Sequence, residues 1–346
     1  MRRYHVVLAS PIGIEATRRD VQAGLRPRHF MLELAARLDA TIHEPSETTA
    51  PPDLLHKILK TPGPVIDLAR RVAAACQDED VIFCNSESVA LPVAQALIKA
   101  RKGARLASFG HNLYRPRIAL AKLLSGAFRR IDRFHVISKD QLRDPDRQRL
   151  YLEQVDDRFF TPRGKAEPAP GPNARPLIVS VGLEQRDYVT LAKATSDMDL
   201  DVRISGASRD ARVLRETFPE VMPANMDKQF YSWPDLRDLY RRADLVVVPV
   251  RPNSYAAGIT SILEALAVGK PVIASRTTGL DGTLADDAAV EWVPPSDAGA
   301  LRSAIARLLQ DAPARDALAE NGAAIFAGHH RKDLRVSYMA DDLKGL

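Results

Sequence analysis

Small and hydroxyl-bearing residues follow a buried apolar run in the second half of the chain. The run Leu245–Val250 is unbroken and rich in β-branched residues, which is typical of a strand covered on both faces. The segment Tyr255–Gly258 then offers almost no side-chain bulk, and Thr260 and Ser261 supply hydroxyl donors. These groups suit a diphosphate, and the carboxylate of Glu264, one helical turn further on, suits the hydroxyls of an attached ribose.

The elements that must hold these residues can be read from the same stretch. Ile259–Ala267 is predicted to be a short helix, and Gly269 and Pro271 mark its end. Val272–Ala274 begins the next strand. A small-residue loop entering a helix leaves backbone amides and the positive end of the helix dipole open to an anion. From this pattern alone, an ordinary strand–helix–strand unit without a phosphate site stays an open alternative.

The residues from Glu264 to Ile273 add a more specific signal. Their sequence, EALAVGKPVI, resembles the nucleotide-sugar motif of family-4-type retaining glycosyltransferases (glycosyl transferases group 1), which have the GT-B fold. In that family an earlier Glu faces the donor sugar, and its position here is Ala256. Either the amides of Ala257 and Gly258 replace that carboxylate, or the sugar sits differently, or catalysis has been lost.

The resemblance implies further donor-binding residues. Val181–Tyr188 resembles the family turn that brings a basic residue to the diphosphate, which assigns that role to Arg186 and makes it a catalytic candidate. Gly182 would let the backbone approach the phosphates. A surface ion pair of Arg186 with Asp187 is the alternative. The implied diphosphate set is Gly182, Arg186, Gly258, Ile259, Thr260 and Ser261, with Glu264 at the ribose.

The nucleobase side is marked by less specific residues. Ser205 and Gly206 follow a strand, as the base-proximal turn of the family does. Phe230 and Tyr231 precede a helix that also resembles the family pattern, and their neighbourhood is a candidate for contacting the base. Ordinary packing of both aromatic rings stays an open alternative.

Acceptor-side candidates lie in the first half of the chain. His111 follows a strand end, where open α/β sheets place their ligands. In relatives a His in this neighbourhood contacts the transferred sugar, so His111 is a catalytic candidate. A purely structural role for His111 is the alternative. Arg26–Phe30 resembles the start of a helix that faces the acceptor in some relatives. The acceptor-side set is Gly13, Arg26, Arg28 and His29.

Alternating strands and helices in both halves predict an α/β chain with two Rossmann-like doubly wound domains. Val155–Pro162 resembles the segment that joins the domains in this family. The resemblance implies the GT-B architecture, with the domains facing a central cleft and a C-terminal helix crossing back. The predicted limits are 1–162 for the acceptor-binding domain, 163–176 for a Pro-rich linker, 177–325 for the nucleotide-sugar domain and 326–346 for the C-terminal helical segment.

Composition restricts the class of protein. The 346 residues are 45% hydrophobic and 27% charged, which is ordinary for a soluble globular chain of two domains. No apolar run reaches the roughly 18–20 residues that cross a bilayer. Cys76 and Cys84 form neither a disulfide framework nor a metal motif, so we expect a cytoplasmic protein without a metal site.

Positive charge is concentrated in the first part of the chain. Residues 1–160 carry 26 Lys and Arg against 19 Asp and Glu, although the net charge of the whole chain is only +5. The segment 115–133 is basic and amphipathic, which suits peripheral contact with the inner membrane face or a lipid-linked acceptor. A solvated or sheet-packed face is the alternative. No nucleic-acid recognition motif is present, so we expect no nucleic-acid partner.

These residues predict a hexosyltransferase-like enzyme (EC 2.4) that uses a UDP- or GDP-type sugar, with retention and without a metal or other cofactor. Lipid-linked, polysaccharide and small-molecule acceptors all stay open. Two alternatives also stay open, a noncatalytic GT-B scaffold or partner subunit that binds nucleotide without turnover, and a sugar-nucleotide epimerase.

Overall fold

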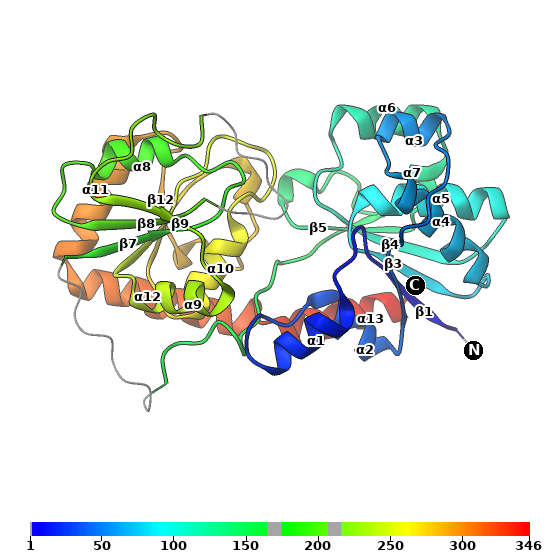
Figure 1. Ribbon diagram of the computed structural model, residues 1–346, viewed down its shortest axis with the longest axis horizontal. Helices are drawn as coiled ribbons and strands as arrows, with labels where there is room; N and C mark the ends of the chain where they lie inside the picture. Colours follow the sequence, from blue (N-terminus) through cyan, green and yellow to red (C-terminus); the bar gives the residue numbers. More distant parts are fainter. Residues whose placement is uncertain (1, 165–174, 207–215) are drawn as a thin grey trace. The chain divides into compact units, whose positions relative to one another are not determined.

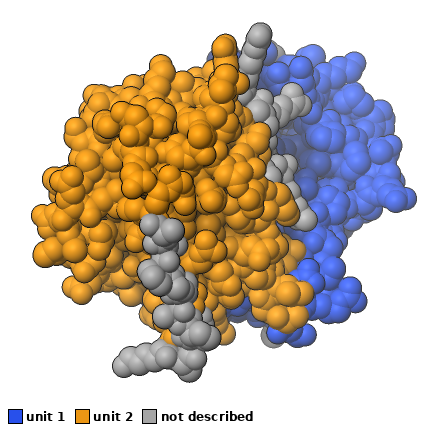
Figure 2. Space-filling model, turned by 60° about the vertical axis from the view of Figure 1, so that its left-hand side comes forward, with its two compact units in different colours: residues 1–22, 28–151, 333–346 blue, residues 23–27, 152–332 orange. Residues whose placement is uncertain are grey.

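The chain folds into two compact units, coloured separately in Figure 2. The computed structural model describes residues 2–164, 175–206 and 216–346. Unit 1 comprises residues 1–22, 28–151 and 333–346, and unit 2 comprises residues 23–27 and 152–332. Most of the predicted linker 163–176 lies outside the described residues. The predicted domain limits remain a proposal.

Unit 1 is built on a six-stranded parallel sheet with the order β2-β1-β3-β4-β5-β6. The order changes direction at the neighbours β1 and β3, so the loops that follow these strands flank the switch point. Its elements are β1 (Tyr4–Val7), α1 (Ile14–Gln22), α2 (Phe30–Leu38), β2 (Thr41–His43), α3 (Leu54–Leu59), α4 (Gly63–Ala75), β3 (Val81–Cys84), α5 (Glu87–Ala100), β4 (Arg105–Gly110), α6 (Pro116–Leu124), α7 (Ala127–Arg130), β5 (Arg133–Val136), η1 (Lys139–Gln141), β6 (Gln148–Leu150) and α13 (Lys332–Lys344).

Both faces of this sheet are covered by apolar contacts. Alternate strand residues such as Ile82 and Leu106 join the core formed with α4, α5, α6 and α7. On the other face, the Phe30 ring of α2 lies 5.7 Å from the Phe109 ring of β4. The strands therefore read as continuous apolar runs, as expected for a parallel sheet buried on both sides.

Unit 2 repeats this architecture with the strand order β12-β11-β10-β7-β8-β9, all parallel. The order reverses between β7 and β10, as in a Rossmann sheet. Its elements are β7 (Leu177–Ser180), α8 (Tyr188–Thr195), β8 (Asp201–Ser205), β9 (Met226–Gln229), α9 (Trp233–Arg242), β10 (Leu245–Val248), α10 (Ile259–Ala267), β11 (Val272–Ser275), η2 (Thr278–Leu280), η3 (Asp287–Ala289), β12 (Glu291–Val293), α11 (Ala298–Gln310) and α12 (Ala312–His329).

The helices of unit 2 also cover both sheet faces (Figure 1). Leu245 and Val247 of β10 join the core formed with α8 and α11. The intervening Val246 and Val248 are equally buried but stand outside that cluster, as the alternation of strand side chains requires. The two doubly wound α/β sheets predicted from the sequence are thus confirmed.

The basic, amphipathic segment 115–133 is not one continuous helix. It contains two helices, α6 and α7, because Ser125 is extended between them (φ −145°, ψ 152°). The Ser125 hydroxyl accepts a hydrogen bond from the Ala127 amide at 3.3 Å, which starts α7. The described residues contain no helix that is long and apolar enough to cross a membrane.

Candidate functional site

The loops after β7 and β10 meet at the point where the strand order of unit 2 reverses. Two backbone bonds hold them together, Asp187 N–H to Pro249 O at 3.0 Å and Arg251 N–H to Gln185 O at 2.9 Å. Open α/β sheets bind ligands at such switch points, outside the carboxyl ends of the strands. The turn that carries Arg186 is therefore fixed beside the loop that leads into α10.

The Arg186 side chain is buried between these loops, with only 3% of its surface exposed. Its Nε donates to Val181 O at 2.9 Å, Nη1 to Glu184 O at 3.1 Å and Nη2 to Ser261 Oγ at 2.8 Å. A guanidinium carries five N–H donors, so within the described part of the chain two are left for a ligand. The structure gives no ion pair between Arg186 and Asp187; the Asp187 carboxylate instead caps α8 by accepting from the Thr190 amide.

Gly182 and Gly258 make room for this guanidinium. Both have left-handed backbone conformations, with φ of 102° and 98°. A Cβ on Gly182 would lie 2.4 Å from Arg186 Nη2, and one on Gly258 would lie 3.0 Å from Val248 Cγ1. A side chain at Gly182 would therefore displace the guanidinium as well as strain the backbone.

The first turn of α10 presents open amides. Gly258 is its N-cap and supplies no capping side chain. Among the described residues, the amides of Gly258, Thr260 and Ser261 have no acceptor. These N–H groups and the positive end of the helix dipole favour an anion. Ile259, which was predicted to be in the diphosphate set, is buried in the core, and its amide donates to Ala256 O at 3.3 Å, so neither its side chain nor its amide is open to an anion.

The two predicted hydroxyl donors differ in their surroundings. Thr260 is exposed at the start of α10. Ser261 is buried, where its hydroxyl accepts from Arg186 and donates to Val181 O at 3.3 Å. Thr260 is therefore the hydroxyl free to meet a ligand, and Ser261 orients Arg186.

Glu264 lies one turn into α10 with its side chain buried. Its Oε2 accepts a hydrogen bond from the Tyr240 hydroxyl of α9 at 2.9 Å. Burial raises the pKa of Glu264 to about 7, while the Tyr240 hydrogen bond and the Arg186 charge act to lower it. The carboxyl group therefore changes charge near neutral pH. Tyr240 was missed in the sequence, although it stands among charged residues on a helix that packs on the sheet.

The two alanines before α10 are buried, with 7% of Ala256 and 3% of Ala257 exposed. The Ala257 amide already donates to Tyr255 O at 2.6 Å, so only the Gly258 amide remains to replace the missing carboxylate. Gly279, which the sequence did not single out, packs against this loop. A Cβ there would lie 2.1 Å from Tyr255 O, so the loop requires glycine at that position.

The predicted base-side residues lie at the ends of β8 and β9. Ser205 is buried and Gly206 is half-buried. The Phe230 side chain is 78% exposed, which contradicts the alternative that this ring packs in the core. Tyr231 is half-buried, and this burial raises its pKa. Residues 207–215, which follow Gly206, lie outside the described residues.

His111 follows β4 in unit 1, near the end of β3. Its Nε2 lies 3.1 Å from Asn85 O, and its backbone amide donates to Glu87 Oε2 at 3.0 Å. Because a carbonyl only accepts, Nε2 is the donor in this contact. The buried Glu87 also accepts from the Asn112 amide at 3.3 Å. Sequence reasoning missed Glu87, which fixes this turn from the start of α5.

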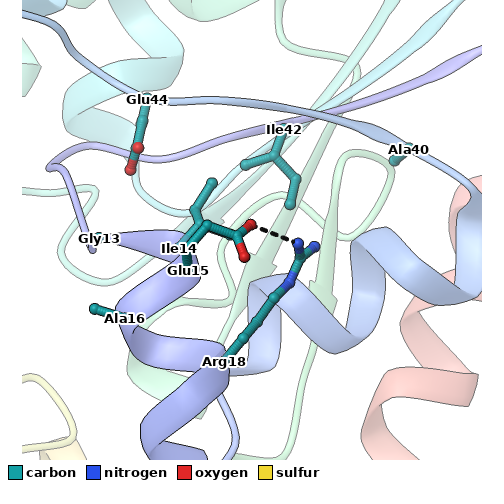
Figure 3. A pocket seen from close by; sticks show the side chains of 8 residues that line it. All are labelled: Gly13, Ile14, Glu15, Ala16, Arg18, Ala40, Ile42 and Glu44. Carbon is teal, nitrogen blue, oxygen red and sulfur yellow. Dashed lines mark hydrogen bonds and ion pairs between the residues drawn. The ribbon is translucent and has the colours of Figure 1, made fainter.

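A pocket of about 600 Å³ opens beside α1 in unit 1 (Figure 3). Gly13, predicted to lie on the acceptor side, lines it at the start of α1. The ion pair between Glu15 Oε1 and Arg18 Nη1, at 2.9 Å, stands at its rim. The Glu44 carboxylate, also in the lining, accepts from the Ile12 amide at 3.1 Å.

The remaining acceptor-side residues do not join this pocket. Arg28 Nη1 lies 2.6 Å from Asp333 Oδ1 of α13 and 3.4 Å from Glu33 Oε2, so it ties α13 to α2. His29 is the N-cap residue of α2. Arg26 falls in unit 2, whereas Gly13 falls in unit 1. Among the described residues there is also no cluster of three His, Cys, Asp or Glu side chains that could hold a metal.

The second half of the chain is similar in sequence to known glycosyltransferases. Residues 192–324 match the family model described as Glycosyl transferases group 1. This match confirms the resemblance seen in the sequence. The D-inositol 3-phosphate glycosyltransferase 2 of Catenulispora acidiphila is 44% identical over 80 residues. That segment is 23% of this chain and only 18% of the length of the relative.

Several solved structures resemble the whole chain. HepE of Anabaena, solved in complex with UDP and glucose, superposes with a TM-score of 0.69 at 15% identity, over 99% of both chains. An alpha,alpha-trehalose 6-phosphate synthase from Burkholderia multivorans gives a TM-score of 0.73 at 14% identity, over 100% of this chain and 99% of that one. These likenesses show the predicted GT-B fold.

Proposed function

We propose that this chain transfers a sugar from a nucleotide-diphosphate donor to an acceptor hydroxyl. The observation that carries the proposal is the Arg186 guanidinium, held between Gly182 and the open N-terminus of α10 with two N–H groups to spare. A fixed cation beside uncapped helix amides suits a diphosphate. The match to the group 1 glycosyltransferase family model supports the same chemistry.

The mechanism follows from where charge develops. As the glycosidic bond stretches, negative charge grows on the leaving diphosphate, and donors that are already oriented lower the barrier. Arg186, the Gly258 and Thr260 amides and the Thr260 hydroxyl would supply these donors, and Glu264 would accept from the ribose hydroxyls. The acceptor hydroxyl passes its proton to the leaving phosphate. These groups would stabilise the leaving diphosphate without a metal, which supports the proposal of a metal-independent enzyme. Retention and transfer of a hexose are proposed from the family resemblance alone.

We further propose that the acceptor uses the pocket of unit 1 at Gly13. Its volume lies within the usual range for small-molecule sites, roughly 300–1,000 Å³. Glu15 and Glu44 offer carboxylates that accept from hydroxyl groups, and Arg18 offers a cation for a phosphate. A small polyhydroxylated acceptor suits this lining, and inositol phosphates belong in the screen because of the name of the relative.

The proposal is tested by a thermal-shift screen of UDP- and GDP-sugars, followed by mass spectrometry of the products with and without a chelator. We expect at least one donor to raise the melting temperature and to be turned over in the presence of the chelator. Proton NMR of the new anomeric centre tests retention. If no nucleotide sugar is bound, the proposed function is wrong.

Ala256 specifically favours one other candidate, a noncatalytic scaffold or partner subunit. An alanine at this buried position cannot contact the donor sugar through a carboxylate. A scaffold of this kind would bind nucleotide without turnover, so the mass-spectrometric step separates it from the enzyme. An epimerase would instead convert the donor in the absence of any acceptor.

Peripheral membrane contact is a further part of the proposal. The outward face of α6 carries Leu120 and Leu123, which are 44% and 83% exposed, with Arg115 and Arg117 exposed at its N-terminal end. Exposed leucines beside arginines are complementary to an anionic bilayer surface.

We also propose a cytoplasmic location. It is supported by the buried free thiols of Cys76 and Cys84.

A further inference from the structure

Tyr240 and Glu264 form a buried pair within unit 2. Tyr240 has no exposed surface, and Glu264 is 5% exposed. The hydroxyl group donates to Glu264 Oε2 at 2.9 Å and comes from a different helix, α9. The Phe160 ring lies 6.3 Å from the Tyr240 ring, edge to face, which helps fix its orientation. This hydrogen bond therefore joins two rigid elements at the residue assigned to the ribose.

A ribose ligand makes two demands on Glu264. The carboxyl group accepts most strongly from the ribose hydroxyls when it is ionised, and it must keep one orientation. Burial opposes the first demand, because a charged carboxylate is costly away from water. A neutral hydroxyl that donates to the carboxylate meets both demands, since it stabilises the charged form and restricts rotation.

The other charges around the pair are few. Burial, followed by the charge of Glu264, raises the pKa of Tyr240 well above its usual value, so this hydroxyl keeps its proton and stays a donor. Arg186 is the cation that acts on both groups. Arg186 is itself held by Val181, Glu184 and Ser261. Within this set, Glu264 is therefore the group that titrates in the physiological range.

We propose that Tyr240 is a positioning residue for the donor: its hydroxyl holds Glu264 as an oriented carboxylate, so that nucleotide affinity rises as this carboxyl group ionises. The inference rests on the proposed function, because it assigns a partner to the ribose-binding residue. Tyr240 itself touches no substrate in this account. Its effect is expected on donor affinity and on the pH at which that affinity develops.

The test compares UDP affinity, measured by calorimetry from about pH 6 to about pH 9, for wild type, Tyr240→Phe and Glu264→Gln. The terminal phosphate of UDP also titrates near pH 6 and makes affinity depend on pH by itself. Glu264→Gln has no titrating carboxyl group at position 264, so its pH profile is the baseline that gives the contribution of the UDP phosphate alone. Relative to that baseline, we expect wild-type affinity to rise through about pH 7. In Tyr240→Phe the rise should move to higher pH, with affinity roughly three- to tenfold weaker at neutral pH and recovered near pH 9.

The matched control is Tyr151→Phe, which removes a buried phenol hydroxyl from unit 1. Its pH profile should overlay that of wild type. Carbon-13 NMR of labelled glutamate in the ligand-free protein gives a second readout, in which Tyr240→Phe should raise the midpoint of Glu264 titration. Identical pH profiles for Tyr240→Phe and wild type would overturn the inference, as would a loss of affinity that is equal at every pH.

Failure of the proposed function would give a different experimental result from failure of the role proposed for Tyr240. If wild type binds no nucleotide at any pH, the donor site itself is wrong, whatever the NMR titration shows. If wild type binds UDP but Tyr240→Phe leaves the profile unchanged, only the role of Tyr240 is wrong. The two results cannot be confused.

Discussion

At the residue scale, the proposed donor site depends on the fit between Arg186 and Gly182, which lies against its guanidinium. Gly182→Ala would place a methyl group 2.4 Å from Nη2, so the guanidinium must leave its position. We expect nucleotide affinity to fall at least about tenfold, the cost of a lost charge-assisted hydrogen bond. Calorimetry with UDP measures this loss.

Gly24→Ala separates this clash from backbone strain. Gly24 also has a positive φ, 69°, but a Cβ there would meet nothing within 4 Å. This variant should lose some stability and keep its affinity for UDP. Equal affinity in Gly182→Ala and wild type would mean that Arg186 does not bind the diphosphate.

Glu264 also predicts how the stability of the free protein depends on pH. Its folded-state pKa, about 7, lies above the unfolded value, so the protonated group contributes stability below about pH 4.5 that is lost as pH rises through about 7. Relative to Glu264→Gln, wild type should lose up to about 3 kcal/mol of unfolding free energy across this window. Urea unfolding at several pH values measures it, and parallel curves for the two proteins would contradict the prediction.

The elements that carry the proposed donor site could be predicted from the sequence, but the contacts within it could not. The positions of Gly258, Thr260 and Glu264 at the start of α10 could be predicted because local spacing fixes a loop, a helix start and one helical turn. The partner of Glu264, Tyr240, comes from another helix, and only the packed sheet brings the two together. The engaged amide of Ala257 was missed for a similar reason, because its turn is set by the close approach of Gly279.

At the scale of elements, α13 is tied to the sheet of unit 1 by one carboxylate. Asp342 Oδ2 accepts from His135 Nε2 at 2.8 Å and lies 2.9 Å from Arg133 Nη1. Burial acts to raise the pKa of Asp342, but the His135 and Arg133 hydrogen bonds outweigh it and lower the pKa. The stabilisation by this carboxylate is therefore present at neutral pH and lost as pH falls through the depressed pKa.

Asp342→Ala should accordingly lower the unfolding free energy by about 2–4 kcal/mol at neutral pH, because it leaves a buried histidine without its acceptor. Urea unfolding at neutral and acidic pH tests this, and the difference from wild type should shrink in acid. Asp341→Ala is the control. The Asp341 side chain is 71% exposed, and its ion pair with Lys344 Nζ is long, at 3.8 Å. Equal losses in the two variants would contradict the anchoring role.

Helices and strands with a clear periodic spacing of apolar residues were predicted well, and elements in which this spacing is weak were not. The helix Ile259–Ala267 and the strands around it have the predicted limits within two residues. The helix α1 was missed because charged residues dominate it and few apolar residues mark its inner face. The break at Ser125 was missed because apolar residues continue on both sides of it.

At the scale of the whole molecule, the uneven charge predicts salt-sensitive binding to anionic vesicles. Wild type should sediment with vesicles containing phosphatidylserine at low salt and be released at high salt. Leu123→Glu should reduce binding several-fold, because it places a carboxylate on the outward face of α6. Val221→Glu is matched in exposure, 83% at both positions, but lies in unit 2 and should change little. Equal binding of the two variants would exclude this face as the contact.

The central claim is that unit 2 holds a working nucleotide-sugar site. The most direct test is mass spectrometry of UDP- and GDP-sugars incubated with wild type and with Arg186→Ala, in the presence of a chelator. We predict donor turnover by wild type and a loss of at least about a hundredfold in the variant, because the leaving diphosphate then meets no cation. Equal turnover by the two proteins, or none by wild type with any donor and acceptor, would contradict the account.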